Sequence, residues 1–160
     1  MEQVLRTIHS MRNVAGNFQE VYFDGEVTRW ASLEMVSFGG DVHFYIRCYH
    51  KQARVITSSI YSFYQDIEVQ EVEDYIERLP TNLQELYEEG YDLYGSEMVL
   101  AKKDAYPIKT YPYFESPDEE RTVDPIGAFL EILGGLNKED FVGIQILTAP
   151  KGYDWAEEWQ

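Results

Sequence analysis

The chain has 160 residues and a formal net charge of −16, with 29 acidic and 13 basic side chains. Its content of hydrophobic residues (44%) and aromatic residues (15%) excludes a disordered chain, and a chain of this length can bury a core without disulfides or metals. All of the net charge lies after residue 65, because residues 1–65 have six acids and six bases. An acidic surface repels phosphate backbones and anionic lipids, so residues 66–160 are not expected to bind nucleic acid directly.

Cys48 is the chain's one cysteine, which excludes an internal disulfide. It lies on the apolar register of residues 43–49, and we interpret it as a small buried hydrophobic residue rather than a reactive thiol. The expected location is therefore the reducing cytoplasm. The sequence shows no signal peptide or membrane-spanning segment.

The first expected element is a helix over residues 3–12, where apolar residues recur at the spacing of one helix face. Those residues are Val4, Leu5, Ile8 and Met11. A strand is expected over residues 18–25, followed by a hairpin in which residues 32–38 and 41–49 alternate between apolar and polar positions. Gly39-Gly40 separates the two strands, and glycines suit the positive φ angles of a two-residue turn.

Residues 51–65 return to helical spacing. The predicted buried face of this helix is Val55, Ile56, Ser59, Ile60 and Phe63. Alternation at Ile67 and Val69 then predicts a strand over residues 66–75 with an acidic outer row. A connector over residues 76–92 is expected to contain a short helix capped near Thr81 or Asn82, and residues 92–111 are expected to form two strand segments around a bend.

The clearest boundaries are those of a helix that begins at Pro125. Asp124 is a suitable N-cap, proline fits the first helical position, and Gly134-Gly135 is a stop signal. The predicted buried stripe is Phe129, Ile132, Leu133 and Leu136. Residues 141–150 are apolar on both registers, which predicts a central strand, and a further helix is expected to begin within residues 152–160.

Helices that alternate with hairpin-paired strands predict the α+β class. We expect a two-layer ferredoxin-like sandwich, with an antiparallel or mixed sheet and helices on one face. The chain is expected to be a single domain over residues 1–160, either complete or excised from a longer chain.

No phosphate loop, dinucleotide fingerprint or metal-ligand spacing occurs in the sequence. His9, His43 and His50 are interpreted as surface or edge histidines, because a metal site needs a third ligand at defined geometry. The acidic rows at residues 68–74 and 118–120 are interpreted as solvated charge rather than catalytic carboxylates. The chain is therefore predicted to be non-enzymatic, with no cofactor and no metal; an enzyme built on a buried carboxylate is the least favoured alternative.

An aromatic segment interleaved with Pro107 and Pro112 precedes the second acidic row. Lys109 is the one base within this segment, which disfavours stacking on nucleic-acid bases and favours core packing or a protein–protein edge. The candidate docking residues are Tyr106, Tyr111, Tyr113, Phe114, Asp118, Glu119 and Glu120.

Three blocks of sequence resemble a known class of protein: SLEMVSFGGDVHFYIR, AKKDAYPIKTYPYFE, and DPIGAFLEIL followed by FVGIQILTAP. They look like the soluble region that precedes the ATPase domain in conjugative-transfer (type IV secretion) ATPase-like proteins of candidate-phylum bacteria. The resemblance spans nearly all of the chain and its motifs are structural rather than catalytic.

The resemblance implies an accessory domain for assembly or docking in a translocation machine. Walker motifs and any membrane anchor would then lie outside these residues, which would place the domain at the inner face of the membrane. Other subunits of the machine are the expected protein partners, and self-association is left open. The alternative is a free-standing acidic small binding protein that captures a basic protein partner.

Overall fold

The computed structural model describes residues 2–11, 29–102 and 124–150. The chain divides into two compact units, one formed by residues 1–65 and 107–160 and the other by residues 66–106. The elements of the first unit are α1 (Glu2–Ser10), β1 (Ala31–Phe38), β2 (Asp41–Cys48), α3 (His50–Phe63), α5 (Pro125–Gly134) and β3 (Phe141–Thr148). Those of the second unit are the 3-10 helix η1 (Tyr75–Arg78) and α4 (Leu83–Glu88).

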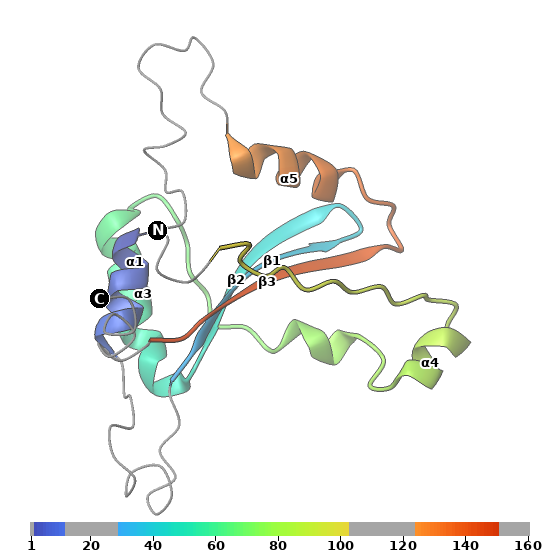
Figure 1. The fold of residues 1–160 in the computed structure, drawn as a ribbon, viewed down its shortest axis with the longest axis horizontal. Helices are drawn as coiled ribbons and strands as arrows, with labels where there is room; N and C mark the ends of the chain where they lie inside the picture. Colours follow the sequence, from blue (N-terminus) through green and yellow to red (C-terminus); the bar gives the residue numbers. More distant parts are fainter. Residues whose placement is uncertain (1, 12–28, 103–123, 151–160) are drawn as a thin grey trace, which may run out of the picture. The chain divides into compact units, whose positions relative to one another are not determined.

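The three strands form an antiparallel sheet in the order β2-β1-β3 (Figure 1). β1 and β2 make the expected hairpin, with φ angles of 59° at Gly39 and 95° at Gly40. A Cβ atom on Gly39 would also lie 2.6 Å from the backbone oxygen of Lys138, so this turn needs glycine for both conformation and space. The α+β class is confirmed. The prediction that residues 141–150 form the central strand is wrong for these three strands, because β1 occupies that place.

Residues that face each other across an antiparallel ladder share one face of the sheet. The register therefore defines an apolar face, made of Ala31, Leu33, Met35, Ser37, Val42, Phe44, Ile46, Cys48, Val142, Ile144, Ile146 and Thr148. The opposite, mixed face is made of Ser32, Glu34, Val36, Phe38, Asp41, His43, Tyr45, Arg47, Phe141, Gly143, Gln145 and Leu147. Cys48, expected to be buried, is half-buried.

The first helix is confirmed and packs against α3, which begins directly after β2 (Figure 1). The buried side chains of this pair are Val4, Ile8, Gln52, Ile56 and Ile60. The hydroxyls of Thr7 and Ser59 lie 2.9 Å apart and link the two helices. The predicted buried face of α3 is correct at Ile56 and Ile60, whereas Val55 and Phe63 are exposed.

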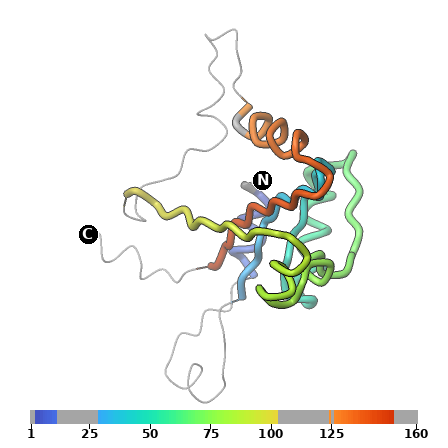
Figure 2. The backbone as a smooth tube through the Cα atoms, turned by 90° about the vertical axis from the view of Figure 1, so that its right-hand side faces the viewer, coloured from blue at the N-terminus to red at the C-terminus, as the bar shows by residue number. Residues whose placement is uncertain are grey.

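α5 begins and ends as predicted. The Asp124 carboxylate accepts a hydrogen bond from the Ile126 backbone N–H at 3.0 Å, and Gly135 is the C-cap. The last turn of α5 contacts the hairpin: the Ser37 hydroxyl donates to the Leu133 carbonyl at 2.8 Å. Figure 2 follows the chain from α5 through a short connection into β3.

The predicted buried stripe of α5 is correct at Leu133 and wrong at Phe129 and Ile132. Leu133 is 2% exposed and Leu136 is half-buried, but Phe129 is 51% exposed and Ile132 is 67% exposed. The reason is tertiary, because the helix meets the sheet through its last turn rather than along its length.

The second unit has little regular structure in its described residues, 66–102. The short helix α4 is confirmed, and Asn82 caps it by accepting from the Glu85 N–H at 2.9 Å. The strands expected over residues 66–75 and from residue 92 onward are absent from these described residues. An alternating pattern forms a strand only when a partner strand is available, and the acidic rows here disfavour close pairing.

Several expectations lie outside the described residues. These are the strand over residues 18–25, the later part of the strand pair over 92–111, and the helix within 152–160.

Candidate functional site

All seven predicted docking residues lie outside the part of the chain that the structure describes. They are Tyr106, Tyr111, Tyr113, Phe114, Asp118, Glu119 and Glu120, within residues 103–123. His43 contacts Asp41 at 3.0 Å on β2, and His50 begins α3. Among the described residues, no group of three or more His, Cys, Asp or Glu side chains is arranged to hold a metal ion.

α5 presents an exposed apolar surface, and two of its residues, Phe129 and Ile132, were predicted to lie in the core. We call Ile126, Phe129 and Ile132 the α5 patch; the three residues follow each other at three-residue spacing and all are exposed. Glu131 is the one charged residue of the helix. An apolar ridge of this kind on a helix is typical of a surface that another protein covers.

The apolar face of the sheet is also incompletely covered. Phe44 on β2 is 65% exposed and Ile146 on β3 is 58% exposed. Both belong to the face on which the last turn of α5 lies, since Ser37 and Leu133 join there. The first unit therefore exposes apolar side chains on a sheet face and on the helix that contacts it.

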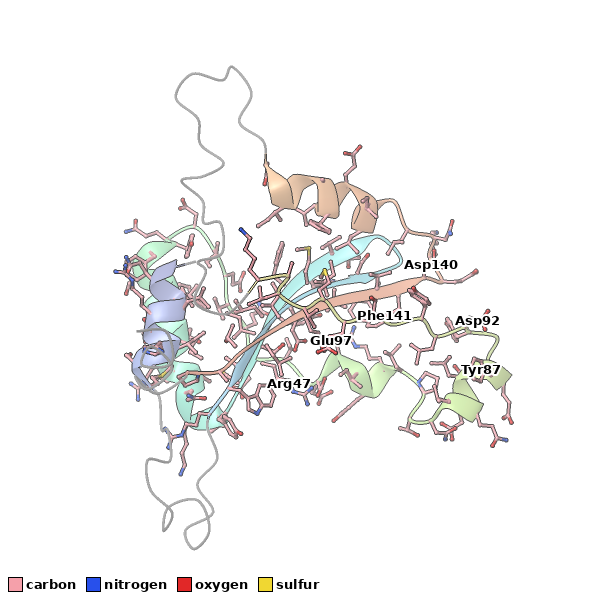
Figure 3. All side chains as sticks on the ribbon, viewed as in Figure 1. Arg47, Tyr87, Asp92, Glu97, Asp140 and Phe141 are labelled. Atoms are coloured by element: carbon pink, nitrogen blue, oxygen red, sulfur yellow. The ribbon has the colours of Figure 1, made fainter. Side chains whose placement is uncertain are left out.

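The mixed face contains a buried carboxylate, Glu34, which is 4% exposed. Its cross-strand neighbours are Tyr45 and Gln145, and Arg47 lies farther along β2 (Figure 3). Each of these four residues makes at least one polar, ring or electrostatic contact. Ser32, also buried on this face, has a hydroxyl with no hydrogen-bond partner in the described structure.

General acid–base pairs of the glycosidase type need two carboxyl groups about 5–9.5 Å apart. On the mixed face the other acid is Asp41, four positions along β2 from the residue that faces Glu34. Four strand residues span about 13 Å, so these two carboxylates do not form such a pair.

Sequence reasoning missed the buried polar residues Ser32, Glu34 and Gln52. Strand alternation assigns Ser32 and Glu34 to the face opposite Leu33 and Met35, and a polar face of a hairpin is ordinarily predicted to meet water. No local signal in the sequence distinguishes a buried mixed face from a solvated one.

The second unit has an acidic surface. Residues 66–102 include 11 acids and two bases. Tyr94, Met98 and Val99 in the segment after α4 are almost fully exposed. Figure 3 labels Tyr87 in α4 and, in the segment after it, Asp92 and Glu97. Acidic and apolar residues therefore lie close together in the sequence of residues 92–100.

In the described ranges, no helix has the length and apolar character needed to cross a bilayer.

The two units define an α+β protein with an incompletely covered apolar surface on its sheet unit and an acidic surface on the other. The whole chain, residues 1–160, matches the family model described as Domain of unknown function (DUF8128), and the chain belongs to that family. No curated protein and no solved structure matches it.

Proposed function

We propose that the chain is a non-catalytic docking domain that binds another protein through the α5 patch. The observation that supports this most directly is the exposure of Phe129 and Ile132, at 51% and 67%, on a well-capped helix anchored to the sheet by Leu133. Isolated exposed apolar residues need no explanation, but a ridge of three on one helix does.

The energetics favour a protein partner for this surface. Removing apolar area from water stabilises a complex by roughly 25 cal/mol per Å², and an aromatic residue buries about 150–250 Å². Phe129 therefore has the size and exposure of an interface anchor, since binding energy concentrates in a few large side chains. Glu131 is the one charged residue within α5, so covering the ridge would desolvate few charged groups of this helix.

The resemblance to the region before the motor domain of type IV secretion ATPase-like proteins supports one setting for this docking. In that setting the partner is another subunit of a DNA- or protein-translocating machine, and the domain works on the cytoplasmic side of the membrane. The ferredoxin-like two-layer arrangement belongs to the same proposal. A solved structure in which the sheet has a fourth strand and all its helices pack on one face would support it.

The docking proposal is tested by site-specific photocrosslinking in the native host. A benzophenone amino acid is placed at Phe129 or Ile132, and, as a matched control, at the exposed polar position Lys51 of α3. We expect both α5 positions to yield the same protein adduct, identified by mass spectrometry, and the control to yield none. Identical adduct patterns at all three positions, or no adduct from α5, would refute the proposal.

The type IV secretion setting has its own test. The adduct from α5 should be a P-loop ATPase or another component of the transfer apparatus, encoded in the same reading frame or next to it. An adduct with a protein of unrelated function would retain the docking proposal and reject this setting.

A second candidate function is the capture of a basic partner by residues 66–102. Their excess of nine acids and the exposed Tyr94, Met98 and Val99 match a partner that is both cationic and apolar. The probe is a synthetic amphipathic Lys/Leu peptide, titrated by calorimetry at low and high salt. Binding that weakens steeply with salt and is lost in the Met98→Ser, Val99→Ser double variant would support this function, whereas salt-independent binding would not.

A further inference from the structure

β2 has an outer edge along which no strand lies in the described part of the chain. In a two-residue hairpin, the residues that flank the turn, here Phe38 and Asp41, form a hydrogen-bonded pair. Hydrogen-bonded and non-hydrogen-bonded pairs then alternate, so the residues of β2 that direct N–H and C=O groups away from β1 are Val42, Phe44, Ile46 and Cys48. The Gly39 N–H donates to the Asp140 carbonyl at 2.8 Å, on the side of β3, which agrees with this phase.

Soluble proteins ordinarily protect such an edge with proline, outward-directed charge or a very short strand. β2 has eight residues and no proline, and the four side chains at its outward positions are all apolar. Phe44, near the middle of the strand, is 65% exposed. The unprotected edge and the exposed aromatic side chain coincide at one position of the strand.

We propose that β2 pairs antiparallel with β2 of a second copy of this chain, with Phe44 facing Phe44 across a two-fold axis. The two three-stranded sheets then become one six-stranded sheet. This register places Val42 opposite Ile46, His43 opposite Tyr45, and Asp41 opposite Arg47. The inference is independent of the α5 patch and does not rest on the docking function.

The charges of β2 favour a second copy of this chain as the partner strand, and they favour this register. Asp41 and Arg47 lie at opposite ends of the strand, so two antiparallel copies bring opposite charges together twice. A slip of one residue would place apolar side chains opposite those of the mixed face. If the register shifts by two residues in one direction, His43 faces His43 of the second copy. If it shifts by two residues in the other direction, His43 faces Arg47. Neither of these two registers brings opposite charges together.

Both faces of the new pair are chemically matched. On the apolar face, Val42, Phe44 and Ile46 of one copy meet Ile46, Phe44 and Val42 of the other. On the mixed face, Asp41 already contacts His43 at 3.0 Å, so its carboxylate is oriented along the face where the second copy's arginine arrives. The N–H and C=O groups of Val42, Phe44 and Ile46, six on each edge, then form ladder hydrogen bonds with the second copy.

Charge reversal tests the register. Sedimentation and light scattering should give the full chain a mass of twice 18.7 kDa at high micromolar concentration. Asp41→Arg and Arg47→Asp should each raise the dimer dissociation constant about tenfold or more, because each changes two cross-strand pairs at once. Combining them restores opposite charges and should return the constant to within about threefold of wild type. A monomeric wild type, or a combined variant as weak as the single ones, would overturn the proposal.

Disulfide trapping tests the two-fold axis without relying on affinity. In a Cys48→Ala background, Phe44→Cys places two thiols on facing residues about 5.5 Å apart at Cα, which is within disulfide range. Val42→Cys is the matched control, since its two copies would lie four positions apart, about 13 Å. We expect a covalent dimer from Phe44→Cys, none from Val42→Cys, and recovery in the Val42→Cys, Ile46→Cys double variant. Equal cross-linking of both single variants, or none in the Phe44 variant, would contradict the proposed axis.

Discussion

Truncation of Leu133 tests the central feature of α5, which is that the helix is anchored through one side chain while its neighbours stay exposed. Leu133 is 2% exposed and Ile132, the next residue, is 67% exposed. The two residues share a helix and a similar size, so Leu133→Ala and Ile132→Ala form a matched pair.

The expected magnitudes differ several-fold. A buried leucine truncated to alanine costs about 2–5 kcal/mol, made of lost transfer energy and a residual cavity. Leu133 belongs to the last turn of α5, which is the part of the helix that meets the hairpin, so its surroundings can partly close the cavity and we expect about 2–3 kcal/mol. Ile132 has about a third of its surface buried, worth below about 1 kcal/mol, and alanine regains part of this through its higher helix propensity. The net cost of Ile132→Ala should be about 0.5 kcal/mol or less.

Urea unfolding followed by far-ultraviolet circular dichroism gives the free-energy differences, provided that the m-value is unchanged. Because the chain has two units, hydrogen exchange of the β1 amides should be measured alongside, as it reports on the sheet unit alone. Equal losses for the two variants, or a larger loss for Ile132→Ala, would refute the placement of α5 on the hairpin.

Substitutions at Ser37, Gly39 and Asp124 test how α5 and the hairpin are held. Ser37→Ala removes the hydroxyl that donates to the Leu133 carbonyl and should cost about 1–3 kcal/mol in urea unfolding, since the carbonyl loses its partner in a buried site. Gly39→Ala should cost more than about 1 kcal/mol, because φ is positive there and the new Cβ would meet backbone at 2.6 Å, whereas Gly134→Ala, where nothing lies within 4 Å, should be neutral or slightly stabilising. Asp124→Ala should lower the free energy of unfolding by about 1 kcal/mol, because it removes the N-cap of α5. Asp124→Asn should retain most of that stability, because asparagine is also a good N-cap; an equal loss for both variants would exclude capping as the cause.

The comparison of α3 with α5 explains where sequence reasoning succeeded. For α3, helical spacing predicted Ile56 and Ile60 as buried, and they are, because α1 covers that face. For α5 the same reasoning predicted Phe129 and Ile132 as buried, and they are exposed. Periodicity shows which residues share a helix face, but the extent of burial depends on how far the partner surface extends.

The second unit shows the corresponding limit for strands. Alternation at Ile67 and Val69 predicted a strand, yet the described residues around them are not in a strand. A helix satisfies its own backbone, while a strand needs a second segment, so strand predictions fail more readily where the neighbouring sequence is acidic.

What the sequence determined by itself is local. The hairpin at Gly39-Gly40, the boundaries of α5 and the cap of α4 follow from positive φ angles, N-capping side chains and helical spacing, which act within a few residues. Only the tertiary structure decided which strand is central, that Glu34 is buried, and that Phe44 and Phe129 remain exposed. These properties depend on surfaces brought together from distant parts of the chain, and no pattern within one segment contains them.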